Sequence, residues 1–281
     1  MEIESVLALA GRSPAALNAA WRAALVARDH GVPLRLLHPA SEPEVAGLAG
    51  EIRERLRLRV TPIAAGRDLL RDAIAAARQA SLLVIGSGRG NPLREWVAGT
   101  QAERLIRLCR VPVLVVKRPA LAGYRRVLVP VDLSPEAATV ISAASRLSRG
   151  PRMEVFHALA SRHEVTMRAS ELPEVVARGL RRGAAQRAEA ALRELIARVA
   201  CEGAEPAVAF GHAASLILAR ERAVAAELVV MGKRQRGLLA DFFLGGVTQR
   251  VLAEGRADVL VMPGARAASP KPVPGSPAYE G

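Results

Sequence analysis

The chain of 281 residues repeats itself, because two of its segments align without a gap. Residues 82–117 read LLVIGSGRGNPLREWVAGTQAERLIRLCRVPVLVVK, and residues 228–263 read LVVMGKRQRGLLADFFLGGVTQRVLAEGRADVLVMP. Gly86 aligns with Gly232, Gly99 aligns with Gly245, and both segments begin and end with an apolar run. A repeat of this length predicts two copies of one structural unit, so both halves of the chain should have the same fold.

The starts of the two copies also match. VLALAGRSP (6–14) lies over VLVPVDLSP (127–135), and a segment with helical spacing of apolar residues follows each. Ser134 with Pro135 predicts a helix start, because serine caps a helix and proline is accepted in its first turn. Short apolar segments at 34–38 and 153–157 then predict a second strand in each copy.

Each copy therefore alternates strands and helices, beginning and ending with a strand. Such alternation is typical of a parallel sheet covered by helices on both faces. We expect an α/β protein of two tandem five-stranded domains of the Rossmann-like type, at 1–118 and 124–263, joined by a short linker at 118–126. The second copy has a longer helix around 173–201. Residues 264–281 are rich in proline, serine and glycine, which predicts a disordered tail.

Charge and cysteine content narrow the classes of function. The formal net charge is +13, mainly from arginine, and favours anionic partners. Arginines are scattered, and aromatic residues make up only 3% of the chain, so stacking platforms for nucleic acid are missing and nucleic acid is not the expected main ligand. Cys109 and Cys201 lie in no paired motif; we expect Cys109 in the core and Cys201 at the surface.

No apolar run reaches the length of a membrane span, and the start of the chain lacks the features of a signal peptide. We therefore expect a cytoplasmic protein without a membrane partner. The five histidines lack the spacing of metal ligands, and no G-x-x-x-x-G-K-S/T motif occurs. Ser134, His157 and Asp132 do not resemble a catalytic triad, because no nucleophile elbow surrounds the serine.

Ligands of open parallel sheets bind at the carboxyl ends of the strands, near the point where the strand order reverses. In the second copy Asp132 follows the first strand and Gly232 ends the fourth, while Gly245 and Gly246 precede a helix at 247–254. Free amides at such a helix start favour a phosphate, and Lys233, Arg234 and Arg236 add positive charge. The alternative stays open that these glycines serve only tight turns and that Asp132 serves a turn or a cap.

The segments VLVPVDLSPEA (127–137) and VMG with FFLGGVTQRVLAEGRADVLVMP (230–232 and 242–263) resemble the opening and closing signatures of the universal stress protein family. The resemblance covers nearly residues 4–263 and implies an adenine nucleotide alpha hydrolase-like fold and ATP, with magnesium, as ligand. The nucleotide-binding residues that it implies are Pro130, Val131, Asp132, Ala158, Met231, Gly232, Arg236, Gly245, Gly246 and Val247.

Nucleotide-binding members of that family carry G-x-x-G, nine residues, then glycine and a serine or threonine. In the second copy Gln235 replaces the middle glycine and Gly246 replaces the hydroxyl residue. In the first copy Gly86, Gly99 and Thr100 match, but Arg89 replaces the middle glycine, and Gly11 replaces the aspartate that contacts the nucleoside. The resemblance therefore implies a site mainly in the second domain, with a degenerate first domain.

The function implied is that of a cytoplasmic stress-response protein that binds or senses a nucleotide and is not an enzyme. A scaffold without nucleotide that acts through protein partners is the alternative. A weak ATPase and a nucleic-acid-associated protein also stay open. The tandem copies resemble a fused dimer, with the last strands, at 112–116 and 258–262, near the pseudo-two-fold interface. Whether this pair forms a homodimer in turn stays open as well.

Overall fold

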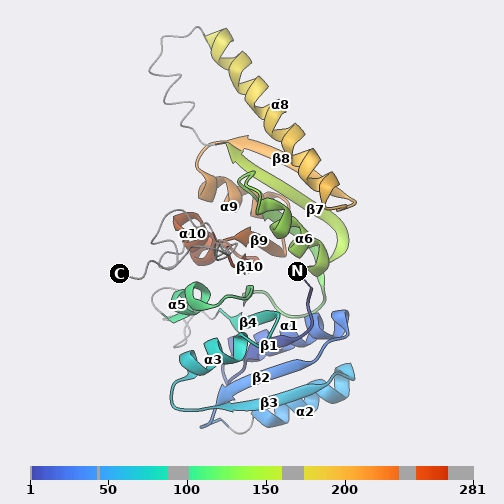
Figure 1. Cartoon of the computed structure of the whole chain (residues 1–281), viewed down its shortest axis with the longest axis vertical. Coiled ribbons are helices and arrows are strands. Elements are labelled where there is room, and N and C mark those ends of the chain that lie inside the picture. Colours follow the sequence, from blue (N-terminus) through green and yellow to red (C-terminus); the bar gives the residue numbers. More distant parts are fainter. Residues whose placement is uncertain (1, 43–44, 88–100, 160–173, 234–244, 265–281) are drawn as a thin grey trace, which may run out of the picture.

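The computed structural model describes residues 2–42, 45–87, 101–159, 174–233 and 245–264, which form a sheet with helices on both faces (Figure 1). The first half contains β1 (Val6–Leu9), α1 (Pro14–His30), β2 (Leu34–Pro39), α2 (Val45–Leu56), β3 (Val60–Ala65), α3 (Leu69–Ala77), β4 (Leu82–Gly86), α5 (Gln101–Leu108) and β5 (Val113–Val116). The second half contains β6 (Tyr124–Pro130), α6 (Ala137–Leu147), β7 (Ser148–Leu159), α8 (Glu174–Arg198), β8 (Ala204–Phe210), α9 (Ala213–Ala223), β9 (Leu228–Gly232), α10 (Gly246–Glu254) and β10 (Asp258–Met262).

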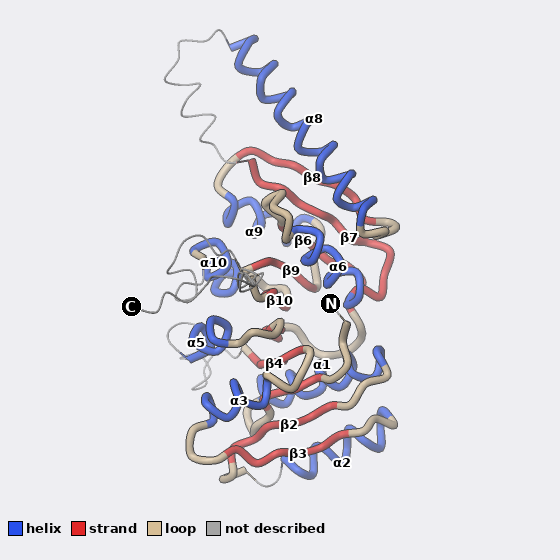
Figure 2. Tube along the Cα trace, in the orientation of Figure 1, coloured by secondary structure: helices blue, strands red, loops and turns tan. Residues whose placement is uncertain are grey.

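The ten strands lie in the order β3-β2-β1-β4-β5-β10-β9-β6-β7-β8. Within each half every paired neighbour is parallel, which confirms the predicted five-stranded parallel sheets. The halves meet where β5 and β10 pair antiparallel, with Leu114 opposite Leu260. The last strands of the two copies thus lie side by side, as the resemblance to a fused dimer implies, and the two halves make one continuous sheet (Figure 2).

Two apolar layers cover the two faces of the sheet. One layer contains buried side chains of α1, α2, α6 and α8, and the other contains those of α3, α5, α9 and α10. The inner strands are short runs of buried aliphatic residues, as a sheet covered on both faces requires. Helix α1 buries a series of alanines, and these small side chains allow it to lie close to the strands.

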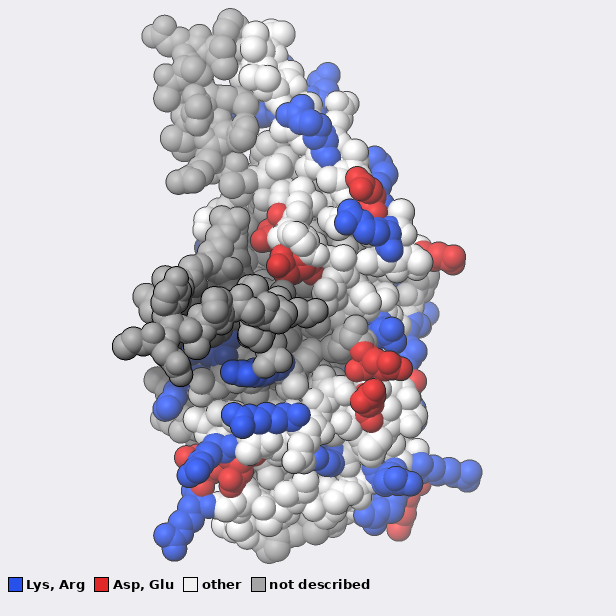
Figure 3. Space-filling view, in the orientation of Figure 1, with Lys and Arg blue, Asp and Glu red and all other residues white. Residues whose placement is uncertain are grey.

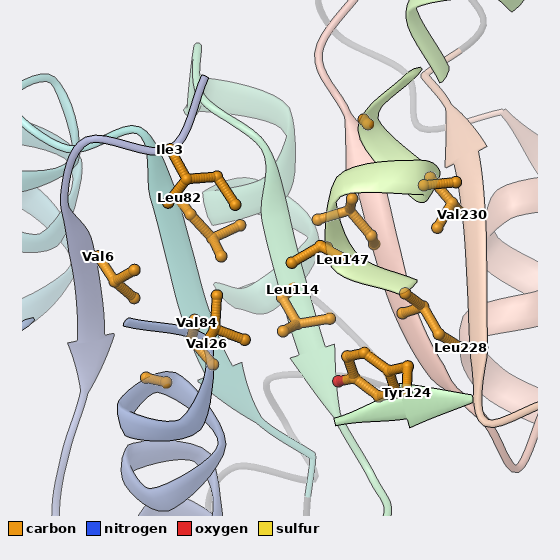
Figure 4. Packing of buried hydrophobic residues seen from close by; sticks show 14 of the residues in the cluster. Ile3, Val6, Val26, Leu82, Val84, Leu114, Tyr124, Leu147, Leu228 and Val230 are labelled. Carbon is orange, nitrogen blue, oxygen red and sulfur yellow. The ribbon is translucent and has the colours of Figure 1, made fainter. Parts of the chain in front are cut away.

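The apolar layer continues across the boundary between the halves. Figure 4 shows Leu114 of β5 between Val84 of the first half and Leu228 of the second. A buried polar cluster lies beside it: Asp258 is fully buried and accepts hydrogen bonds from the Tyr124 hydroxyl at 2.6 Å and from the amides of Lys117 and Arg118, each at 2.8 Å. The halves therefore pack closely, as a short linker predicts.

A cation completes this cluster from the first half. The Arg22 Nε of α1 lies 3.3 Å from an Asp258 carboxylate oxygen, and the Arg22 guanidinium stacks 4.5 Å from the centre of the Tyr124 ring. Both charges are buried and paired, which is the condition under which a buried charge is tolerated. Burial raises the pKa of Tyr124 well above its usual value, and the charge of Asp258 raises it further.

Three predicted details differ in the structure. The linker is shorter than 118–126, because Tyr124 already belongs to β6 and is held by Asp258. Ser134 does not cap α6, which begins at Ala137 without a side-chain cap. Cys201 is buried near Met153 and not at the surface, because the end of α8 packs on the sheet. Burial raises its pKa.

The other predicted details agree or lie outside the described residues. Cys109 is buried, and burial raises its pKa to about 12, so its thiol stays protonated. The longer helix of the second half is α8. The predicted tail, 264–281, lies outside the described residues except for Gly264.

Basic side chains are spread over both halves on the face in Figure 3, where no single basic tract crosses the described surface. This distribution matches the scatter of arginines in the sequence. Among the described residues, no helix is both long enough and apolar enough to cross a membrane.

Candidate functional site

The strand order reverses at β6, which pairs with β7 on one side and with β9 on the other. The register places Val127 opposite both Met153 of β7 and Leu228 of β9, so the three strands end at the same edge of the sheet. The chain leaves β6 at Pro130 and β9 at Gly232. The structure therefore brings the predicted aspartate and the first predicted glycine to one edge, at the switch point where open α/β sheets bind ligands.

Asp132 lies exposed at this edge, and its carboxylate also serves the local turn. One carboxylate oxygen accepts a hydrogen bond from the Ser134 amide at 3.2 Å. Leu133 between them has a positive φ of 59°. Aspartate favours such turns because its side chain can bond to the backbone two residues later. The turn role that the sequence left open is thus real, and it leaves the carboxylate at the surface of the switch point.

The residues beside Asp132 are held by β7. The amide of Val131 donates to the carbonyl of Phe156 at 2.9 Å, and the carbonyl of Val131 lies 2.8 Å from the His157 ring nitrogen Nδ1. Because a carbonyl can only accept, this contact requires the proton on Nδ1. His157 thus orients the backbone at Val131, while Ala158 lies partly buried at the end of β7.

Gly232 ends β9 with room beside it. Among the described residues, the nearest atom to a Cβ built there is Val140 Cγ2 at 3.4 Å, the outer limit of a tight contact, and the φ of Gly232 is not positive. Neither packing nor backbone conformation demands glycine at this position. Met231, the residue before it, is buried in the core and contributes only its backbone to the edge.

Helix α10 begins at the same edge, with Gly245 as its N-cap and Val247 packed against the core. No described side chain caps this helix start, and no described atom lies within 4 Å of a Cβ built on Gly246. The first amides of a helix lack intrahelical partners and carry the positive end of the helix dipole. An uncapped start with open space in front can accept a phosphate.

The first half has a different arrangement at the matching positions. A Cβ built on Gly86 would lie 2.6 Å from the Ala15 carbonyl carbon and closer still to its oxygen. Helix α1 is capped by the Ser13 hydroxyl, which accepts from the Ala16 amide at 3.1 Å. The start of α1 therefore fills the space beside the end of β4.

The lost aspartate of the first half has a neighbour that the sequence did not indicate. A Glu42 carboxylate oxygen accepts from the Arg12 amide at 2.9 Å and lies 3.2 Å from a Cβ built on Gly11. A side chain longer than glycine at position 11 would compete with this carboxylate for space. Among the described residues, the chain itself thus occupies this edge of the first half.

Lys233 does not belong to the phosphate region, so this part of the sequence prediction is wrong. Its side chain is 6% exposed, and its ammonium donates to the carbonyl of Arg107 in the first half at 2.6 Å. The burial of the position between the halves is the physical reason. The residues Arg89, Gly99, Thr100, Arg234, Gln235 and Arg236 lie outside the described residues.

Three features of these edges were not predicted from the sequence. They are the Ala15 carbonyl beside Gly86, the Glu42 carboxylate beside Gly11, and the contact of Lys233 with the first half. The carbonyl of Ala15 has no sequence signal, because any residue supplies one. Lysine does have a signal here, since only three lysines occur among the 40 cationic residues of the chain. Such a rare residue type next to a predicted site could have been singled out.

Comparison with known proteins gives one family. Residues 68–117 and 123–263 match the model of the universal stress protein family, which is about two thirds of the chain. No functionally curated protein matches the chain.

Three solved structures share the fold over nearly the whole chain. A protein of unknown function from Pseudomonas aeruginosa PAO1 is 22% identical, with a TM-score of 0.67 over 93% of this chain and 92% of that chain. A protein from P. aeruginosa UCBPP-PA14 is 23% identical, with a TM-score of 0.67 over 93% of each chain. A universal stress protein from Archaeoglobus fulgidus DSM 4304 is 18% identical, with a TM-score of 0.64 over 92% of this chain and 96% of that chain.

Proposed function

Because the chain belongs to the universal stress protein family, we propose that it is a cytoplasmic, non-enzymatic stress-response protein that binds ATP, with magnesium, in its second half. The observation that carries the proposal is the room at two glycines: among the described residues, a Cβ built on Gly232 meets only Val140 Cγ2, at 3.4 Å, and one built on Gly246 meets no atom within 4 Å. Neither glycine is demanded by packing against described residues or by a positive φ. A glycine that neither packing nor backbone conformation requires can instead serve a ligand, because a ligand can approach the backbone closely where no side chain is present.

The roles of the residues follow from their places at the edge. Asp132 would accept hydrogen bonds from the ribose or the base, the role that the resemblance implies for the aspartate after the first strand. The amides at the start of α10 would bind phosphate oxygens, and the helix dipole would favour the negative charge. Val131 and Ala158 would line the nucleoside side, where His157 fixes the backbone at Val131.

The first test is isothermal titration of the full chain with MgATP, comparing the wild type with Gly246→Glu and Gly246→Ala. The glutamate places a negative charge at the helix start, where it repels phosphate but stabilises the helix by about 0.3 to 1 kcal/mol. We expect about one site per chain in the wild type, no detectable binding in Gly246→Glu, and binding in Gly246→Ala, whose methyl group meets no described atom within 4 Å.

Asp132→Asn gives a second variant, because asparagine keeps the oxygen that accepts from the Ser134 amide and removes only the charge. We expect weaker binding of MgATP than in the wild type. Equal MgATP affinity in the wild type and Gly246→Glu would place any nucleotide elsewhere. The absence of both heat and thermal shift at millimolar MgATP would favour the scaffold that acts through protein partners. Phosphate release above a heat-killed control would contradict the non-enzymatic part.

A further inference from the structure

Two of the three lysines of the chain lie where the halves meet. The chain uses arginine for nearly all of its cations, yet Lys117 and Lys233 bond backbone carbonyls across the boundary. A lysine ammonium is a compact point charge on a slim stem, whereas a guanidinium is a broad planar fork. Lysine suits these two positions for a physical reason: a compact ammonium can approach a buried backbone carbonyl in less space than the broad guanidinium needs.

Lys117, directly after β5 of the first half, binds the end of a helix of the second half. Its ammonium donates to the carbonyls of Leu252 at 2.7 Å and Gly255 at 2.9 Å, at the carboxyl end of α10. The last carbonyls of a helix lack intrahelical partners and carry the negative end of its dipole, so a cation is favoured there. Burial lowers the pKa of Lys117 to about 8, although the carboxylates of Glu221 and Asp258 act in the opposite direction.

Lys233, directly after β9 of the second half, makes the reverse contact. Its ammonium donates to the Arg107 carbonyl in the last turn of α5, and its amide donates to the Met262 carbonyl of β10 at 2.9 Å. Each half thus gives one lysine to the last helix of the other half. The backbone of Lys233 follows Gly232, where the proposed site begins, and the other end of α10 is Gly245–Gly246.

We infer that Lys117 and Lys233 are positioning residues through which the first half fixes the two segments that frame the site of the second half. The inference rests on the proposed nucleotide site. Lys117 holds the far end of the helix whose first amides would bind phosphate, and Lys233 holds the chain as it leaves Gly232. Binding groups lose affinity when displaced by about 0.5 Å, so a helix without its far anchor would bind phosphate less well.

The coupling between the first half and the nucleotide site must act in both directions. If the first half improves nucleotide binding in the second, nucleotide binding must stabilise the contact with the first half by the same free energy. The sensitive part of the first half is α5, because Lys233 bonds its last turn. A degenerate domain would then have a function, as the fixed support of a site that it does not itself contain.

The experiment compares full-length wild type with Lys117→Met, Lys233→Met and Lys271→Met. Methionine has a similar length without the charge, and Lys271→Met removes the only other lysine as the matched control. The readouts are MgATP affinity by titration and amide hydrogen exchange of peptides from 101–108 and 246–254. In the wild type we also measure exchange of 101–108 with and without MgATP, which requires no variant to fold.

We expect Lys117→Met and Lys233→Met to weaken MgATP binding by about 2-fold to 30-fold, the range for residues that act on a site without touching the ligand. Exchange should quicken in 246–254 for Lys117→Met and in 101–108 for Lys233→Met, with β1 and β2 unchanged. MgATP should slow exchange of 101–108 in the wild type and fail to do so in Lys233→Met. Lys271→Met should match the wild type throughout.

Wild-type affinity in both variants, or exchange of 101–108 that does not respond to MgATP in a wild type that binds it, would overturn the inference. Exchange that quickens equally in all strands would show a general loss of stability and would overturn it as well. If the wild type binds no MgATP, the proposed function is contradicted, and the inference about the lysines is not yet decided by affinity. Exchange of 246–254 in Lys117→Met then decides the positioning role alone: faster local exchange supports it, and unchanged exchange overturns it.

Discussion

Gly86 and Gly232 align in the repeat and end the fourth strand of their halves, yet their surroundings differ. The backbone of Ala15 fills the place of a side chain at Gly86, whereas Val140 only borders that place at Gly232. The start of the first helix explains the contrast. Helix α1 begins at Pro14, but α6 begins at Ala137, two positions later in the aligned sequences. Gly86 is required by the packing of the chain, whereas Gly232 is not required by its described neighbours.

The largest expected difference concerns these two glycines. Gly86→Ala should lower the free energy of unfolding by about 3 kcal/mol, because the methyl group would overlap a backbone carbonyl that cannot rotate away. Gly232→Ala should change it by less than about 1 kcal/mol, because its methyl group meets the end of one side chain at contact distance. Urea unfolding followed by circular dichroism measures both. Similar losses in the two variants would show that the second half is as closed as the first.

The helix starts should differ by a smaller amount. Ser13 caps α1, so Ser13→Ala should cost about 1 kcal/mol of stability. Ser134→Ala should cost less than about 0.5 kcal/mol, because α6 begins later and the Ser134 side chain does not cap it. The same unfolding measurement tests the pair. A loss of 1 kcal/mol in Ser134→Ala as well would mean that α6 begins earlier in solution, with less space at Gly232.

The smallest effect tests how far the second half has departed from its family. Gly246→Ser restores the hydroxyl that the resemblance implies and would add one hydrogen bond to phosphate. Such a bond contributes about 1 kcal/mol, so MgATP should bind about fivefold more tightly than in the wild type. Titration beside Gly246→Ala separates the hydroxyl from the loss of glycine. An equal gain in both variants would assign the effect to helix stability.

The fold could be predicted because a repeat doubles the signal of each element. The runs at 82–86 and 228–232 could be predicted as strands because both are short and apolar, which is typical of strands buried on both faces of a sheet. The pairing of β5 with β10 could be expected from the resemblance to a fused dimer. The start of α6 could not be predicted. Ser134 and Pro135 have the local chemistry of a helix start, but Ser134 lies in the turn that the Asp132 carboxylate closes, and the helix begins at Ala137.

The candidate site could be predicted only where its residues act through the local chain. Asp132, Gly232, Gly245 and Gly246 follow strands or begin a helix, and parallel strands bring these positions to one edge. Lys233 was misplaced because its partner, the Arg107 carbonyl, belongs to the other half. A contact between distant segments that uses a backbone carbonyl has no residue type by which a sequence could reveal it.

The antiparallel pairing of β5 with β10 is a contact between two halves of one molecule, and residues 117–123 connect them. Two separate chains that met through the same strands would part on dilution, and the fraction assembled would follow their concentration. A short connection replaces that dependence with an effective concentration in the millimolar range. The pairing of these halves is therefore independent of how much of the protein a cell makes, and the supporting half is present whenever the other half is.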